Sequence, residues 1–188
     1  MGRWEPNARG RLERAALELY GERGFEQTTV AEIAKRAGLT ERTFFRHFAD
    51  KREVLFAGSD MLRELLARTV ADAPDSAAVI EVTTAAVEAV GAVLQERRDQ
   101  ARRRQAVIVA NMELRERELI KLASLASALA GALRERGVPD LAASLAAEAG
   151  IAVLRVAFER WVDAAGEEDL LVLIREAVDE LKAVTAGA

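Results

Sequence analysis

Residues 28–56 read TTVAEIAKRAGLTERTFFRHFADKREVLF, and this stretch decides the fold of the first part of the chain. Its first half carries apolar side chains at the i, i+3, i+4 and i+7 spacing of one helix face. They are Val30, Ile33, Ala34 and Ala37. Gly38 suits the left-handed position that ends a helix, and Thr40 suits the N-cap of a second helix over Glu41–Phe48. The stretch therefore predicts two short helices joined by a tight glycine turn.

The second of these helices has an apolar face and an outward face with a different chemistry. Phe44 and Phe48 lie four residues apart and are expected to face inward. Arg42, Phe45 and Arg46 are expected to face outward. This arrangement is typical of the helix-turn-helix motif, whose second helix enters the major groove of DNA. The alternative is a helical hairpin of an ordinary bundle, and an exposed phenylalanine between two arginines argues against it.

The segment resembles the DNA-binding domain of the TetR family of one-component transcriptional repressors. The residues that match the family pattern are Thr28, Thr29, Ile33, Ala34, Ala37, Gly38, Thr40, Phe44, His47, Phe48, Lys51 and Leu55. Phe45 departs from the pattern, because the family usually carries tyrosine there, so only ring contact with the sugar-phosphate backbone carries over. The resemblance implies an all-α fold. An N-terminal three-helix helix-turn-helix domain would precede a C-terminal helical domain for ligand binding and dimerisation.

The composition agrees with a helical protein and excludes several classes of site. Of the 188 residues, 51% are hydrophobic but only 5% are aromatic, which favours helix over strand. Cysteine is absent, which excludes disulfides, thiolate metal sites and thiol nucleophiles. No signal-peptide core and no uninterrupted apolar run of membrane-spanning length occurs, so the sequence predicts a soluble, cytoplasmic protein with no membrane partner.

The charge is distributed unevenly along the chain. The net charge is −4, but residues 1–51 contain ten basic and eight acidic side chains, whereas the remaining residues contain 17 and 23. A mildly basic N-terminal part on an acidic remainder fits a DNA-binding module attached to a domain that does not bind DNA.

Glycine, proline and capping signals divide the chain into about nine helices. They are expected at about 8–23, 30–37, 41–48, 51–71, 77–97, an arginine-rich segment up to a break near Asn111, 112–136, 140–165 and 167–183. Capping boxes are expected at Thr29 with Glu32 and at Asp50 with Glu53, and Ser76 is expected to cap the fifth helix. The predicted domains are 1–52 and 53–188, with the helix from about residue 51 linking them.

The last two predicted helices are apolar on nearly every face, so each must be covered on two sides. A second subunit provides such a cover most simply, through a two-fold four-helix bundle, and the family resemblance implies the same homodimer. The residues expected at this interface are Val153, Val156, Leu170, Leu173 and Ile174. The alternative is that both helices are central within one monomer.

Side chains of the helix-turn-helix segment are the candidates for DNA contact. Arg42 and Thr43 are expected to contact bases, since arginine binds guanine through two hydrogen bonds and threonine offers a hydroxyl and a methyl group. The residues expected to contact the DNA backbone are Thr28, Thr40, Phe45, Arg46, His47 and Lys51. Arg3, Arg9 and Arg11 are further candidates for phosphate or the minor groove. His47 is the only histidine, and no cluster completes a metal site.

The C-terminal part offers candidates for ligand binding, but it does not identify the ligand. Large apolar side chains line small-molecule sites, which suggests Met112, Phe158 and Trp161, with Met61, as pocket walls. The alternative is that these residues belong to the core or to an interface. The arginines of residues 97–104 are either a solvated helix end and loop or a rim that binds an anionic ligand, such as a carboxylate or an acyl thioester of coenzyme A. The stretch ELRERELIKL at 113–122 resembles the ligand domain of an actinobacterial-type branch of TetR regulators.

These observations predict a sequence-specific DNA-binding regulator. It would be a homodimeric repressor that a small-molecule effector releases from a near-palindromic operator, without a cofactor and without enzymatic activity. The alternative is an all-α small-molecule-binding protein or enzyme that retains a helix-turn-helix-like N-terminal part. That alternative needs a catalytic constellation in the second domain, and the sequence contains none.

Overall fold

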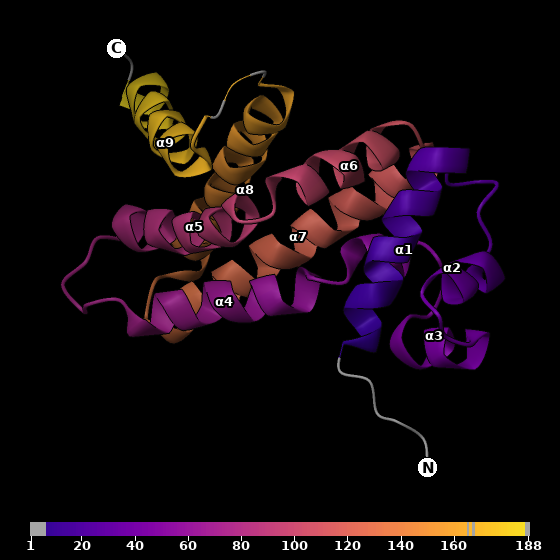
Figure 1. Cartoon of the computed structure of the whole chain (residues 1–188). Helices are drawn as coiled ribbons and strands as arrows, with labels where there is room; N and C mark the ends of the chain where they lie inside the picture. The colour runs from indigo at the N-terminus through magenta and orange to yellow at the C-terminus, as the bar shows by residue number, and fades with distance from the viewer. Residues whose placement is uncertain (1–6, 165, 167, 187–188) are drawn as a thin grey trace. The chain divides into compact units, whose positions relative to one another are not determined.

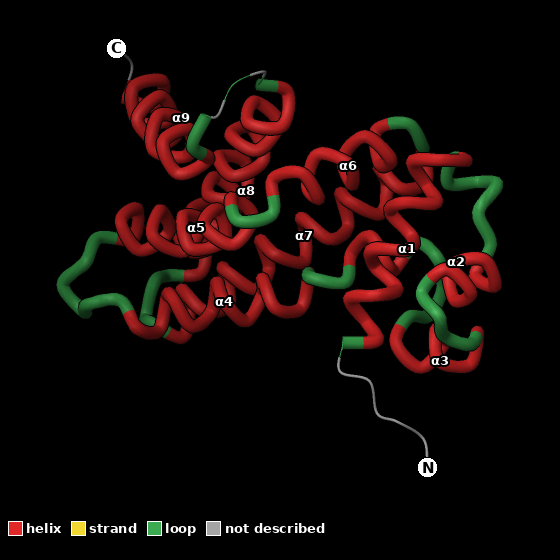
Figure 2. The backbone as a smooth tube through the Cα atoms, in the orientation of Figure 1, coloured by secondary structure: helices red, strands yellow, loops and turns green. Residues whose placement is uncertain are grey.

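The computed structural model describes residues 7–164, 166 and 168–186. These residues form nine α-helices and one 3-10 helix and contain no strand, so the all-α prediction is confirmed (Figures 1 and 2). The elements are α1 (Ala8–Arg23), α2 (Val30–Arg36), α3 (Glu41–His47), the 3-10 helix η1 (Glu53–Phe56), α4 (Ser59–Asp72), α5 (Val79–Gln95), α6 (Arg98–Val109), α7 (Met112–Glu135), α8 (Asp140–Asp163) and α9 (Leu170–Ala186).

The helices form two compact units. The first comprises the described residues up to Ala57 together with Arg102–Glu118, and the second comprises Gly58–Ala101 and the described residues from Leu119 onward. Helices α6 and α7 therefore contribute residues to both units. This division differs from the predicted domains 1–52 and 53–188, because residues 53–57 and 102–118 belong to the N-terminal unit.

The segment 102–118 joins the first unit through its side chains. Val107, Ile108 and Leu114 lie in the same buried cluster as the apolar side chains of α1, α2 and α3. Arg104 donates a hydrogen bond from Nε to the Leu55 carbonyl oxygen (2.6 Å). Its guanidinium also lies 5.0 Å from the centre of the Phe56 ring and donates to the Glu118 carboxylate (2.9 Å). A segment distant in sequence is thus part of the core of the first unit.

The predicted helix ends around α2 and α3 are confirmed. The Thr29 side chain and the Glu32 carboxylate form the reciprocal capping box at the start of α2. Gly38 has a positive φ of 67°, and the Leu39 amide donates to the Ala34 carbonyl (2.8 Å), which is the Schellman ending of a helix. The Thr40 hydroxyl accepts from the Thr43 amide (3.2 Å) and so caps α3. These local contacts set the turn between the two helices.

Two predicted helix starts are wrong. The chain does not form one helix from residue 51 to 71: η1 is a separate 3-10 turn, and α4 begins at Ser59. In a continuous helix the Leu55 carbonyl would accept from the amide four residues later, but it accepts from Arg104 instead. Likewise α5 begins at Val79, where Glu81 accepts from the Ala78 amide (2.9 Å), so Ser76 is not its cap.

In the second unit, α5 packs against α4, α8 and α9 around a core of small and large apolar side chains. Two glycines permit the closest helix contacts. A Cβ atom on Gly91 would lie 2.5 Å from Cδ1 of Ile174, and one on Gly150 would lie 2.6 Å from Cγ2 of Thr83. Helix α8 is long and apolar enough to cross a membrane by length and composition alone. The core helix of a soluble protein meets the same criterion. Helix α8 buries Trp161 completely within this core.

The predicted interface residues lie mostly inside the monomer. Val153, Leu170, Leu173 and Ile174 are all buried in the core of the second unit. Among the predicted set only Val156 is exposed. The reason is that α5 of the same chain covers the faces of α8 and α9 for which the sequence argument invoked a second subunit. The alternative stated above, in which these helices are central within one monomer, therefore holds for those faces.

Candidate nucleic-acid interface

Helix α3 has a buried face and an exposed face, and packing of the buried face fixes the direction of the exposed one. Phe44 is fully buried, and its ring centre lies 5.6 Å from that of Phe48, which is also buried. Arg42, Phe45 and Arg46 are exposed, and the Phe45 ring packs edge-on against Phe44 at 5.5 Å. The predicted sidedness of the helix is therefore present in the structure.

The two arginines of α3 differ from other arginines of the same unit. Arg36 forms ion pairs with Glu18 and Glu22, and Arg23 pairs with Glu32. Arg42 and Arg46 form no ion pair with any residue that the structure describes. Their guanidinium groups are thus available for phosphate oxygens or base edges, which arginine binds with paired hydrogen bonds.

The remaining polar side chains of α3 have mixed surroundings. The hydroxyls of Thr40 and Thr43 lie 3.0 Å apart, and Thr40 is exposed whereas Thr43 is half-buried. His47 is half-buried, and its Nε2 is buried without a hydrogen-bond partner among the described residues. Burial, together with the charges of Arg46 and Arg9, lowers the pKa of His47. At neutral pH this side chain is therefore uncharged, and a contact with phosphate would be a neutral hydrogen bond.

Thr28 and Lys51, two predicted phosphate contacts, are engaged inside the protein. Thr28 is 1% exposed, and its hydroxyl donates to the Gly24 carbonyl (2.8 Å). The Lys51 ammonium donates to the carbonyls of Phe25 (2.8 Å), Glu26 (3.2 Å) and Thr28 (3.0 Å). An ammonium has three N–H donors, so all of them are used. We correct the prediction: the donors of these two side chains hold the α1–α2 loop in place and are therefore not free to bind phosphate.

The candidate arginines of the N-terminal segment also have internal partners. Arg3 lies outside the described residues. Arg9 donates to the Ala57 carbonyl and pairs with Glu13 at 3.3 Å. Arg11 donates to the Ala37 carbonyl at the end of α2. Sequence reasoning missed these roles, and it also missed Tyr20, whose hydroxyl donates to the Lys51 carbonyl (2.6 Å) and whose pKa is raised by burial.

The candidate ligand-binding residues do not form one group. Trp161 is fully buried, and the half-buried Phe158 lies 5.8 Å from it, ring centre to ring centre. Met112 is 68% exposed and belongs to the first unit, so it is not part of that aromatic pair. The arginines of 97–104 lie mostly on helix α6 and not in a loop. Arg98 contacts Trp161, whereas Arg104 is built into the first unit.

Comparisons with known proteins agree with this geometry. The family of bacterial regulatory proteins of the tetR type matches residues 13–57, and the MftR C-terminal domain matches residues 77–186. The HTH-type transcriptional regulator TcmR of Streptomyces glaucescens is 54% identical over 46 residues, a match that covers 24% of this chain and 20% of TcmR.

Two solved structures resemble most of the chain. FadR of Bacillus subtilis, in complex with stearoyl-CoA, is 22% identical with a TM-score of 0.64, and the match covers 92% of this chain and 96% of FadR. FadR of Thermus thermophilus, a repressor in complex with lauroyl-CoA, is 26% identical with a TM-score of 0.57, and the match covers 92% of each chain. The helix-turn-helix match at the N-terminus and the match to more than half of the chain at the C-terminus lead to one conclusion. The chain belongs to the TetR family of DNA-binding transcriptional regulators.

Proposed function

We propose that the chain is a homodimeric repressor whose α3 helices bind two half-sites of a near-palindromic operator, and that a small-molecule effector releases it. The observation that carries the proposal is the outward face of α3, where Arg42, Phe45 and Arg46 are exposed above the buried Phe44. The two half-sites would be about 34–36 Å apart, or a multiple of that distance, so that both helices reach the same face of the duplex.

The residues of this face have separate roles in the proposal. Arg42 and Thr43 contact base edges in the major groove. Thr40, Arg46 and the ring of Phe45 contact the DNA backbone and set the position of the helix. His47 contributes as a neutral hydrogen-bonding group, because its pKa is lowered.

The proposed dimer uses the exposed side of α8, and not the buried residues named from the sequence. Exposed apolar side chains recur along this helix at spacings of four and seven residues, which places them on one face. This α8 stripe consists of Leu141, Leu145, Ala152 and Val156. Leu141 and Leu145 are 73% and 62% exposed in the protomer. Exposed apolar side chains that share one helix face are candidates for an interaction surface, and a two-fold axis would pair this face with its copy.

An apolar effector is proposed for the second unit, whose core contains the Phe158–Trp161 pair. The relative from Thermus thermophilus binds lauroyl-CoA, which consists of an apolar chain and a charged carrier. Its 26% identity over most of both chains supports an effector of similar character here. The effector would bind better to a conformation that DNA does not favour, and by linkage DNA would then weaken effector binding by the same factor.

The decisive test of this mechanism compares effector affinity with and without saturating operator. The DNA would be the intergenic region upstream of the gene, first tested for binding by gel shift, and lauroyl-CoA would be the first probe. We expect lauroyl-CoA to bind less tightly when operator is present and to raise the melting temperature of the free protein. Equal affinities in the two conditions would show that the compound is not an inducer.

We infer that regulation of transcription, and no catalysed reaction, is the function of the chain. The support is that both parts of the chain match models of TetR-family regulators. A regulator of this kind acts where bacterial DNA lies, so we expect it in the cytoplasm.

A further inference from the structure

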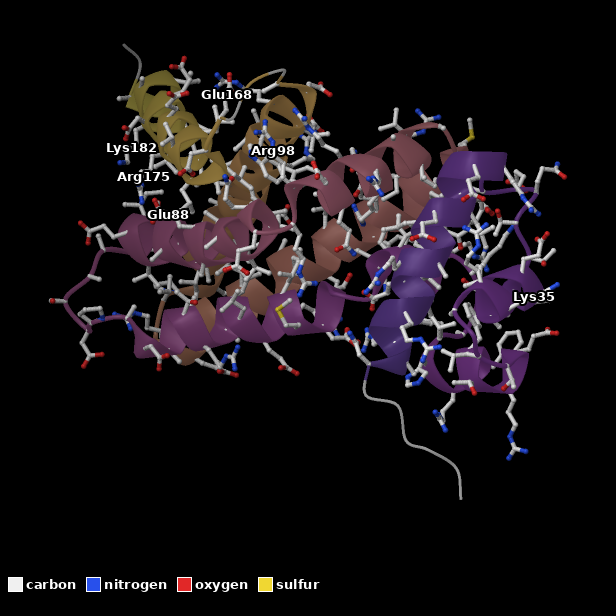
Figure 3. All side chains as sticks on the ribbon, in the orientation of Figure 1. Lys35, Glu88, Arg98, Glu168, Arg175 and Lys182 are labelled. Atoms are coloured by element: carbon white, nitrogen blue, oxygen red, sulfur yellow. The ribbon has the colours of Figure 1, made fainter. Side chains whose placement is uncertain are left out.

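Arg98 is the first residue of α6 (Figure 3), and its side chain contacts Trp161 in the last turn of α8. Its guanidinium carbon is 5.3 Å from the centre of the fully buried Trp161 ring. Its Nη2 donates to the Trp161 carbonyl oxygen (3.2 Å). The Trp161 indole nitrogen donates in turn to the Glu168 carbonyl (3.1 Å), which fixes the ring. The guanidinium is therefore held in one orientation against the ring and the end of the helix.

Among the residues that the structure describes, Arg98 has no counter-ion of the kind that comparable arginines have. The half-buried Arg63 pairs with Asp60, and Arg117 pairs with Glu53. No described carboxylate lies within ion-pair distance of Arg98, although Glu168 belongs to the adjoining turn (Figure 3). Its Nε is also buried and has no hydrogen-bond partner among the described residues. A charged donor that is withheld from water and left without an acceptor is unfavourable, and an anion at this position would satisfy it.

A purely structural role explains only part of this geometry. One N–H of Arg98 binds a carbonyl in the last turn of α8, where a cation is favourable because of the helix dipole. The contact with the indole face is a favourable cation–π contact. Neither contact uses the Nε donor, and neither neutralises the charge at the edge of an apolar core.

We propose that Arg98 binds the anionic end of the effector, while the apolar body of the effector lies against Phe158 and Trp161. The inference rests on the proposed function, because it concerns the same effector. Phe158 and Arg98 are both half-buried, and each lies against the fully buried Trp161 ring. The recognised chemistry is an apolar chain that ends in an oxyanion. A free fatty acid would supply a carboxylate, and an acyl-CoA would supply phosphates.

The test measures the affinities of three twelve-carbon probes for the full chain. They are dodecanoate, lauroyl-CoA and 1-dodecanol, which share the apolar chain but differ in the charge of the other end. The chain has two tryptophans, so Trp4→Phe leaves Trp161 as the only indole reporter of binding. The variants are Arg98→Gln and Arg98→Lys in this background. Arg97→Gln is the matched control, because it removes the same charge from the exposed neighbouring residue.

We expect Arg98→Gln to weaken binding of the anionic probes at least about tenfold, which corresponds to one charge-assisted hydrogen bond. Binding of 1-dodecanol should be unchanged, and Arg97→Gln should bind all three probes like the parent. Arg98→Lys keeps the charge and should retain part of the preference for acid over alcohol. The anionic probe that loses more affinity identifies the source of the anion.

Three results would overturn the inference. The parent could bind none of the probes, Arg98→Gln could bind the anionic probes as tightly as the parent does, or it could lose affinity for acid and alcohol equally, which would indicate a structural role. Operator binding and its release are measured on the same proteins. If an anionic probe releases operator from Arg98→Gln and from the parent alike, the proposed regulation stands while the role of Arg98 fails.

Discussion

Replacing Leu145 with glutamate should dissociate the proposed dimer while leaving the protomer folded. Leu145 is 62% exposed in the protomer, so about two-thirds of its side chain remains to be buried by a partner. Complete burial of a leucine is worth about 1.5–3 kcal/mol, so this fraction contributes roughly 1–2 kcal/mol per copy. A two-fold axis doubles the loss to about 2–4 kcal/mol, and an unpaired buried carboxylate adds to it. The dimer dissociation constant should therefore rise at least about 30-fold.

Sedimentation velocity over a range of protein concentrations measures this change directly. Leu119→Glu is the matched control, because Leu119 is 63% exposed and lies on α7, outside the α8 stripe. We expect this control to remain dimeric. Leu173→Glu should instead unfold the second unit, since its side chain is buried in the core. An intact Leu145→Glu dimer, together with a dissociated Leu119→Glu protein, would refute the reasoning and move the interface to α7.

Three further predictions concern the DNA-binding unit. Arg42→Ala should weaken operator binding by about 1–3 kcal/mol and should weaken binding to random DNA far less. Fluorescence anisotropy measures both affinities, with Arg36→Ala as the control. An equal loss of affinity on both DNAs would mean that Arg42 contacts only phosphate. Lys51→Met should lower the free energy of unfolding by about 2–3 kcal/mol in urea titrations. It should not change the slope of the logarithm of the DNA-binding constant against the logarithm of the salt concentration, whereas a slope smaller in magnitude by about one would indicate a phosphate contact. Because the folded-state pKa of His47 is lowered, its contribution to stability is present above about pH 6.5 and is lost as the pH falls through that lowered value. Urea unfolding at stepped pH should therefore show a decline that His47→Gln abolishes, and identical profiles for the two proteins would rule out this contribution.

The sequence was sufficient wherever neighbouring residues determine the structure. The capping box of Thr29 and Glu32 and the left-handed Gly38 are local devices, and each appears as expected. The sidedness of α3 also follows from the spacing of its phenylalanines, because burial of Phe44 forces Phe45 outward. Local spacing thus predicted the motif that belongs to the DNA-binding unit.

Contacts between residues distant in sequence account for the failures. The break before α4 depends on Arg104, and the burial of Thr28 and Lys51 depends on how the α1–α2 loop closes. A motif match says that a lysine recurs at a position, but it does not say whether its ammonium binds phosphate or carbonyls. Similarly, an apolar face on α9 does not reveal that α5 of the same chain covers it. No periodicity in the sequence contains this information.

The central claim is that α3 reads a DNA sequence, and an equilibrium titration tests it most directly. The full chain is titrated against the DNA site that it protects in its own upstream region and against a shuffled duplex of equal length, at one salt concentration near the physiological value. A sequence-specific regulator binds its site about 10³-fold or more tightly than non-specific DNA. We expect a ratio of that order for the parent protein. A ratio near one, with both affinities falling steeply with salt, would mean that the basic face of α3 only attracts phosphates, and it would contradict the account.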